Sequence, residues 1–220
     1  HTSGLPALPP GVAITNPGDP YAGMRLRDLH AALGRVELGR APGTAFEYSN
    51  FAVMLLSEAL SRRLGQPLEA ALDQHLFTPL GMDGAYLDER PAQVKPVQGH
   101  GPNRAPVPAW TFRDDTGGVG AVRATLDDMV AWVQAQLGAA PGGLQPVLEL
   151  TQQPAWDSGQ PAMGMGWILA PLNGRQVHAH EGGTGGFSSM VAFDREAGRG
   201  VVVLSDTALH SLGGLGSLGL

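Results

Sequence analysis

The chain has 220 residues, of which 43% are hydrophobic, and a formal net charge of −6. This length and composition suffice for one domain, or two closely joined subdomains, with a buried core, and they exclude a disordered chain. The negative charge argues against a nucleic-acid-binding surface. The absence of cysteine excludes disulfides, thiolate nucleophiles and cysteine metal ligands. The longest apolar run, Phe51 to Leu56, is far too short to span a membrane.

The first part of the chain predicts a loop followed by helices. His1 to Tyr21 is rich in Pro and Gly and predicts an ordered loop, either one wall of a cleft or a plain connection. Leu26 to Leu33 predicts a short helix. Apolar residues repeat at helical spacing from Asn50 to Leu64, and Pro67 begins a further helix that reaches Leu76.

The middle of the chain predicts a long irregular segment and then helices again. Asp83 to Thr116 has little periodicity, and such segments often carry function. Trp110 and Phe112 in this segment either line a substrate cleft or anchor the loop. A capping-box pattern at Thr125 opens a helix that stops before Gly138, and a short helix follows from Leu144 to Leu150.

The last third predicts an antiparallel sheet, with Asn173-Gly174 as a hairpin turn. A Gly-interrupted helix is expected after Asp206. The sequence therefore predicts an α+β fold in a single domain over 1–220, with a mostly helical subdomain over 22–150 and a sheet with a C-terminal helix over 160–220. The expected strands are Met163 to Ala170, Arg175 to His180, Ser188 to Asp194 and Val201 to Ser205.

The Gly-rich stretch from His180 to Phe187 is the first candidate for a functional site. Glycine has no Cβ, so a ligand or another backbone can approach the main chain closely. A strand edge of this kind can aim N–H groups at a developing oxyanion. The alternative is a Gly-rich hairpin without further function.

Four segments in this order resemble the serine β-lactamase-related family, which includes class C β-lactamases, penicillin-binding DD-peptidases, D-aminopeptidases and esterases. The resemblance covers nearly the whole chain. It implies an antiparallel sheet flanked by helices, and acyl transfer through a serine ester on a β-lactam, ester or amide bond. It implies no cofactor. The segments are His1-Thr2-Ser3-Gly4-Leu5-Pro6, Tyr48-Ser49-Asn50, Pro79-Leu80-Gly81-Met82 and His180-Glu181-Gly182.

The resemblance also implies roles for individual residues. Tyr48 would be the general base, which requires a nearby positive charge because a free tyrosine has a pKa near 10. Asn50 would hold a lysine and a substrate carbonyl or amide, and the Gly183 N–H would stabilise the oxyanion. His180 would replace the usual lysine and bind substrate together with Gly182. The structural alternatives are an N-cap role for Asn50 and a buried, hydrogen-bonded phenol for Tyr48.

Glu181 departs from the family pattern, in which a hydroxyl residue is usual at this position. A carboxylate here would repel the carboxylate of a β-lactam. We therefore expect a preference for neutral esters, or for peptides with a free amine. His178 and His180 share a strand face and could bind zinc, but no third ligand is obvious nearby.

The nucleophile of the family, Ser-x-x-Lys, is absent from this sequence. Lys95 is the sole lysine, and Ala92 stands three residues before it. We read Ser49 as structural because it has no lysine partner. We expect the nucleophile on a missing N-terminal segment, together with the first helix and the first strands of the sheet. No signal peptide is recognised in these residues, so the compartment stays open.

The sequence favours the first of three possible functions. The first is a serine hydrolase whose nucleophile lies outside this chain. The second is a non-catalytic module that binds peptides or peptidoglycan-like ligands. In the third, another chain supplies the missing segment, and a large apolar groove would mark the place where the nucleophile helix belongs. Neither a nucleic-acid partner nor a membrane span in this chain is expected.

Overall fold

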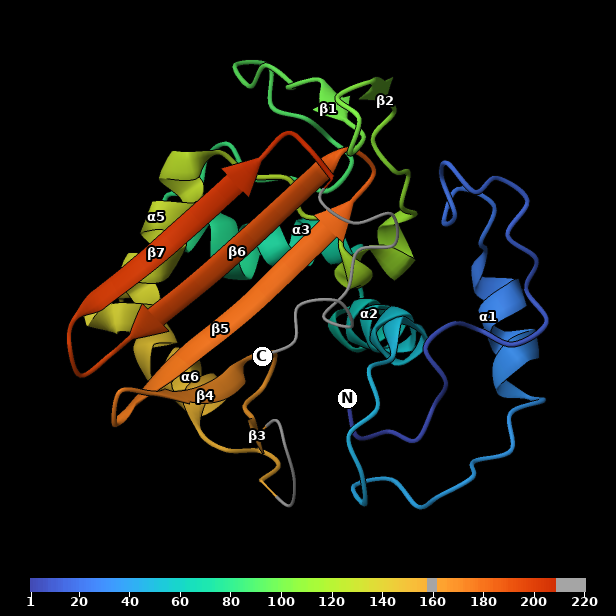
Figure 1. Ribbon diagram of the computed structural model, residues 1–220, viewed down its shortest axis with the longest axis horizontal. Coiled ribbons are helices and arrows are strands. Elements are labelled where there is room, and N and C mark those ends of the chain that lie inside the picture. Colours follow the sequence, from blue (N-terminus) through green and yellow to red (C-terminus); the bar gives the residue numbers. More distant parts are fainter. Residues whose placement is uncertain (158–161, 209–220) are drawn as a thin grey trace.

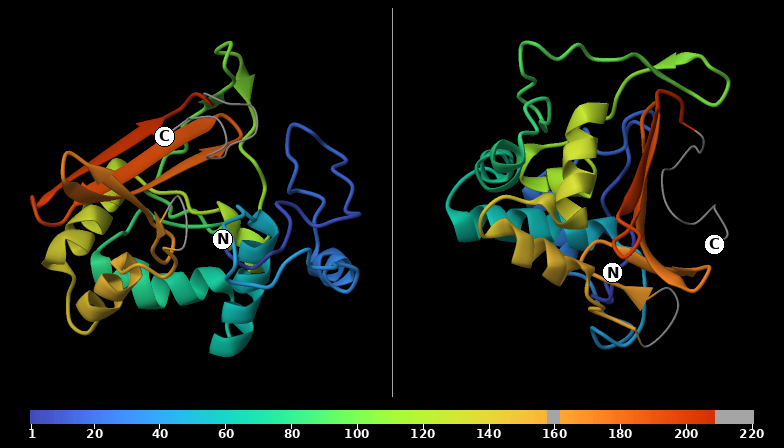
Figure 2. Two further views of the ribbon diagram at one scale, coloured as in Figure 1. Left: turned by 60° about the horizontal axis from the view of Figure 1, so that its bottom comes forward. Right: turned by 90° about the vertical axis from the view of Figure 1, so that its left-hand side faces the viewer.

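Helices and a sheet form two layers in this computed structural model, which describes residues 1–157 and 162–208 (Figure 1). The helices gather on one face of the main sheet (Figure 2). The helical elements are α1 (Leu26–Leu33), α2 (Asn50–Leu64), α3 (Leu68–Leu72), the π-helical η1 (Asp73–Phe77), α4 (Thr78–Leu80), the 3-10 helix η2 (Asp114–Val119), α5 (Leu126–Gln134), the π-helical η3 (Ala135–Ala139) and α6 (Leu144–Gln152). The strands are β1 (Gly99–His100), β2 (Pro106–Val107), β3 (Ala162–Met163), β4 (Ile168–Leu172), β5 (Arg175–Thr184), β6 (Phe187–Asp194) and β7 (Arg199–Ser205).

The main sheet is antiparallel, with strand order β3-β4-β5-β6-β7, and a separate small sheet pairs β1 with β2. This is the α+β arrangement that the sequence predicts. The division into subdomains over 22–150 and 160–220 stays a prediction. Among the residues that the structure describes, no helix has both the length and the apolar character needed to cross a membrane.

The helix predicted from Asn50 is present as α2, but the cap is a different residue from the expected one. Ser49 is the N-cap, because its hydroxyl oxygen accepts a hydrogen bond from the Ala52 N–H at 3.0 Å. The N-cap role for Asn50 was therefore wrong, since Asn50 is the first helical residue. The helix ends at Gly65, whose φ of 68° is the left-handed conformation that glycine tolerates.

Other helices also differ from the prediction at one end, and α6 ends at Gln152 where Leu150 was expected. The helix expected from Pro67 to Leu76 continues through η1 and α4 to Leu80. It stops there because Gly81 adopts a φ of 67° and leaves the helical path. The predicted capping box of α5 is present, with reciprocal hydrogen bonds between Thr125 and Asp128.

The sheet corrects one predicted strand. Met163 to Ala170 is two short paired strands, β3 and β4, because the chain turns between them at Gly166 with a φ of 83°. The hairpin at Asn173-Gly174 is confirmed, and both residues have the positive φ that its turn requires. The helix predicted after Asp206 falls mainly on residues 209–220, which lie outside the described residues.

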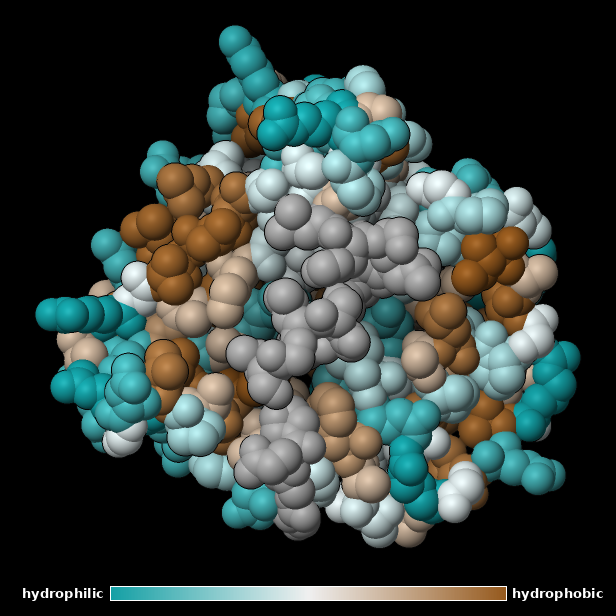
Figure 3. All heavy atoms as spheres, in the orientation of Figure 1, coloured by the Kyte–Doolittle hydropathy of each residue, from teal (hydrophilic) through white to brown (hydrophobic). Residues whose placement is uncertain are grey.

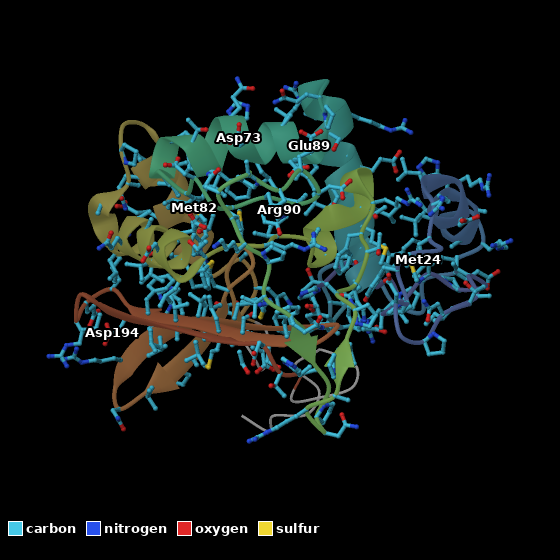
Figure 4. All side chains as sticks on the ribbon, turned by 90° about the horizontal axis from the view of Figure 1, so that it is seen from above. Met24, Asp73, Met82, Glu89, Arg90 and Asp194 are labelled. Carbon is cyan, nitrogen blue, oxygen red and sulfur yellow. The ribbon has the colours of Figure 1, made fainter. Side chains whose placement is uncertain are left out.

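Three clusters of buried apolar side chains join the elements. Two lie within the helical layer, where Figure 4 shows Met24 and Met82 at separate places. The third lies between α5 and the sheet, and it includes Val133, Trp167 and Phe193. Burial of these side chains is what holds the helices against one face of the sheet.

Candidate active site

The opening loop runs alongside the segment that leads into α2. The Gly43 N–H donates to the Thr2 carbonyl at 2.7 Å, and the Asn50 N–H donates to the Ala7 carbonyl at 3.0 Å. The Ser49 hydroxyl donates to the Pro6 carbonyl at 2.7 Å, which joins two residues that are 43 positions apart in the chain. These bonds make the opening loop a fixed support for Tyr48 and Asn50.

Ser49 is fully buried between the opening loop and α2. Its exposed fraction is 0%, and its backbone is extended, with φ −138° and ψ 106°. Ser49 is thus structural, as its lack of a lysine partner predicts, and its two hydrogen bonds fix the backbone between Tyr48 and Asn50.

Asn50 has a partner that the sequence analysis missed. Its side-chain amide donates to the Tyr21 hydroxyl at 2.9 Å. The Tyr21 ring stacks on Phe112 with 5.1 Å between centroids, and Trp110 lies at 5.5 Å. Burial raises the pKa of Tyr21 above its usual value, while the hydrogen bond from Asn50 acts in the opposite direction. Tyr21 belongs to no recognisable motif, so only the folded chain reveals it.

Tyr48 is half-buried, and it remains a protonated phenol at neutral pH. Burial is the main cause that raises the pKa of Tyr48, and the negative charge of Glu181 raises it further. Among the described residues, no cation acts on Tyr48 to oppose these effects. The requirement for a positive neighbour that the sequence analysis named is therefore unmet within this part of the chain.

Half of β5 has a strand neighbour on one side only. β4 pairs with β5 from Arg175 to Ala179, and in the described residues no strand continues along that side. The half from His180 to Thr184 pairs only with β6, where Gly183 lies opposite Ser188. Backbone N–H groups along this open edge are available to a ligand. This is the position at which the sequence analysis placed an oxyanion site.

His180 and Glu181 lie on the open half of β5. Burial lowers the pKa of His180, while hydrogen bonding to the Glu181 backbone and the charge of Glu181 oppose that effect. The imidazole is therefore neutral at neutral pH. Within the described residues, no hydrogen bond joins His180 to Tyr48, and no cation forms an ion pair with Glu181.

Trp110 and Phe112 connect the long irregular segment to the sheet and to the opening loop. Phe112 is 8% exposed and belongs to the core, so it anchors the segment. Trp110 is half-buried and packs on the β5–β6 turn, where a Cβ placed on Gly185 would lie 2.5 Å from the Trp110 ring. Glycine at position 185 is what allows this close approach.

Two hollows on the described surface lie apart from the candidate site. One has a volume of about 350 Å³ and is lined by Arg25, Leu26, Arg27 and Arg113. The other has a volume of about 400 Å³, and Pro6, Arg35, Arg40 and Glu47 are among its lining residues. Neither includes Tyr48, Asn50 or His180, and neither is the large apolar groove considered above.

His178 is buried in the core, where its ring contacts other residues and not His180. Its ring stacks on Phe193 with 4.8 Å between centroids, and its Nε2 lies 3.2 Å from the Gln152 carbonyl. Among the described residues, no group of three or more His, Asp or Glu side chains is placed to hold a metal ion.

Comparisons with known proteins bear on this arrangement. A family model described as Beta-lactamase matches residues 1–211. The D-alanyl-D-alanine-carboxypeptidase/endopeptidase AmpH of Escherichia coli is 27% identical over 219 residues, which cover 93% of this chain and 56% of that protein. A Beta-lactamase of the same organism is 27% identical over 210 residues, which cover 76% of this chain and 53% of that protein.

A solved class C beta-lactamase has the same fold, with a TM-score of 0.79 and 22% identity over 96% of this chain and 63% of that one. The β-lactamase/transpeptidase-like fold that the sequence implies is thus confirmed. The chain spans about half the length of the curated relatives named above. Because the family model covers 1–211 of the 220 residues, the chain belongs to the β-lactamase family, whose relatives found here are hydrolases of the β-lactamase and penicillin-binding kind.

Proposed function

We propose that this chain is the part of a serine hydrolase that carries its general base and its oxyanion edge. The proposed reaction is acyl transfer on an ester, amide or β-lactam bond. The observation that carries the proposal is that Tyr48, which directly precedes the N-cap of α2, lies within electrostatic reach of Glu181 on the open half of β5. Such a juxtaposition brings a proton acceptor and backbone N–H donors to one place.

In the proposed reaction, a serine hydroxyl attacks the carbonyl carbon of the substrate and Tyr48 takes the hydroxyl proton. The Gly183 N–H donates to the oxygen that becomes negative, and His180 donates a hydrogen bond to the substrate. The carbonyl–leaving-group bond then breaks, and Tyr48 returns the proton to the leaving group. Water hydrolyses the serine ester in a second step of the same kind.

We infer that the serine and its lysine lie on residues outside these 220. The single lysine, Lys95, has Ala92 three positions earlier, so no Ser-x-x-Lys is present. The raised pKa of Tyr48 supports this inference, because the phenol needs a cation before it can act as a base at neutral pH. In this proposal the chain by itself binds ligands and does not form a serine ester.

Labelling with a serine-reactive fluorophosphonate, followed by intact mass spectrometry, tests this proposal. This chain alone should remain unlabelled, and a longer form that carries Ser-x-x-Lys should gain one label. Tyr48→Phe in the longer form should slow labelling by at least about tenfold, as expected on loss of a general base. If this chain alone takes up the label, one of its own serines is the nucleophile and the proposal is wrong.

Glu181 is the residue that we propose to select the substrate. The charge of its carboxylate raises the pKa of Tyr48, and in the described residues no cation forms an ion pair with Glu181. A substrate carboxylate at this place would be repelled, while a neutral group or an amine would be accepted. The longer form should therefore prefer an activated ester over a chromogenic cephalosporin, and Glu181→Thr should reduce that preference. A strong preference for the cephalosporin would contradict the proposal.

A further inference from the structure

His1 contacts Tyr48 and both residues that flank it. The Glu47 N–H donates to the His1 carbonyl at 2.8 Å, and the Ser49 N–H donates to His1 Nδ1 at 3.1 Å. The His1 and Tyr48 rings lie against each other with 4.1 Å between centroids and 34° between planes. His1 therefore makes three contacts with Tyr48 and its two neighbours, and two of these contacts use the imidazole side chain.

The hydrogen bond from Ser49 determines which form of the imidazole is present. Because Nδ1 accepts that bond, it carries no proton, and the neutral ring carries its proton on Nε2. Ser49 has an exposed fraction of 0%, so loss of this acceptor would leave a buried N–H without its partner. The ring contact restricts the phenol in addition, since an aromatic pair of this spacing favours particular orientations.

We propose that His1 is a positioning residue for Tyr48, and that its imidazole sets the direction in which the Tyr48 hydroxyl points. This inference rests on the proposed function, in which that hydroxyl exchanges a proton with the nucleophile and the leaving group. Proton transfer requires heavy atoms within hydrogen-bond distance, so a small rotation of the phenol lowers the rate. Substrate binding does not require the same alignment.

Two variants separate the two contributions of the side chain. His1→Asn retains an oxygen acceptor near the position of Nδ1 and removes the ring. His1→Phe retains a ring on Tyr48 and removes the acceptor. The backbone bond from Glu47 persists in both, so neither should unfold this segment. His75→Phe is the matched control, because His75 is exposed on η1, away from the site.

The first measurement is an NMR experiment on this chain, and it requires no substrate. In NMR spectra, the Tyr48 ring protons should be shifted by the ring current of the imidazole, and Tyr48→Phe identifies those signals. The shift should be lost in His1→Asn and unchanged in His75→Phe. Tyr48 signals that are the same in His1→Asn as in the wild type would overturn the proposal.

The second measurement is hydrolysis of an activated ester by the longer form. Both His1 variants should lower kcat by about tenfold or more while KM stays within about threefold, because alignment and not binding is disturbed. A KM that rises while kcat is unchanged would overturn the positioning role. A failure of the proposed function would show itself differently, as a Tyr48→Phe variant with wild-type kcat.

Discussion

Ser49 illustrates at the residue scale how a structural side chain can support two functional neighbours. Its hydroxyl donates to the Pro6 carbonyl and accepts from the Ala52 N–H, so it joins the opening loop to the start of α2. Tyr48 and Asn50 are oriented by this junction. Their geometry therefore depends on a residue that takes no part in the proposed chemistry.

Replacement of this hydroxyl should be costly. We expect Ser49→Ala to lower the free energy of unfolding by about 2 kcal/mol, because it removes an N-cap and leaves the partly buried Pro6 carbonyl without this donor. Ser61→Ala is the matched control on the same helix, since the Ser61 hydroxyl is buried and makes no hydrogen bond. That variant should change stability by less than about 0.5 kcal/mol. Urea unfolding measures both, and equal effects would contradict the cap assignment.

His178 makes stability depend on pH. Burial lowers the pKa of His178, although its hydrogen bond to Gln152 opposes the shift. As the pH falls below about 6.5, the unfolded chain takes up a proton that the folded chain does not, and stability decreases until the folded ring is also protonated. His178→Gln should flatten the dependence of the unfolding free energy on pH over this window. His75→Gln, at an exposed position, serves as control, and parallel curves for all three proteins would refute the prediction.

The turn between β5 and β6 shows at the element scale why glycine is needed near the site. Thr184 pairs with Phe187, so Gly185 and Gly186 alone make the turn. Gly186 has a φ of 83°, and its carbonyl accepts a hydrogen bond from the His100 N–H at 3.1 Å. The open half of β5 is thereby connected to the small sheet formed by β1 and β2.

A side chain at Gly186 should therefore destabilise the protein more than a side chain at an open turn. A Cβ on Gly186 would lie 2.7 Å from Gly99 Cα, whereas Gly198, with a φ of 63°, has open space around it. We expect Gly198→Ala to cost about 1 kcal/mol for the left-handed backbone alone, and Gly186→Ala at least about 1 kcal/mol more. Thermal or urea unfolding of the two variants provides the comparison, and similar losses would show that the contact with Gly99 does not matter.

At the scale of the whole molecule, part of the main sheet carries exposed apolar side chains that the other described residues do not cover. β7 is the edge strand, and Val201 and Val203 on it are 50% and 52% exposed. Met190 on the neighbouring β6 pairs with Val203 and is 39% exposed. Figure 3 shows the corresponding apolar patch over β6 and β7.

An unpaired, apolar edge strand favours association with other chains. We expect this 220-residue chain to self-associate as its concentration rises, and Val203→Lys to reduce that association. Val147→Lys is the control, because Val147 is 54% exposed on α6 and lies outside the sheet. Sedimentation velocity measures the effect, and equal behaviour of the two variants would exclude β7 as the associating edge.

Recognition of the candidate site from sequence had a clear limit. Tyr48, Asn50, His180 and Gly183 could be proposed because each lies in a short contiguous motif. His1 and Tyr21 were not assigned roles, since their contacts join residues 48 and 29 positions apart in the chain. No local pattern encodes which distant side chain will reach a motif.

The sequence by itself determined the family, the α+β class, and the start and type of most helices and hairpins. These features follow from local signals, such as the capping box at Thr125 and the turn at Asn173-Gly174. Only the tertiary structure decided that β4 stops opposite Ala179, that Glu181 acts on Tyr48, and that the His1 ring lies against the phenol. These are consequences of how distant segments pack, and the free energy that selects one packing comes from burial over the whole chain and not from any single motif.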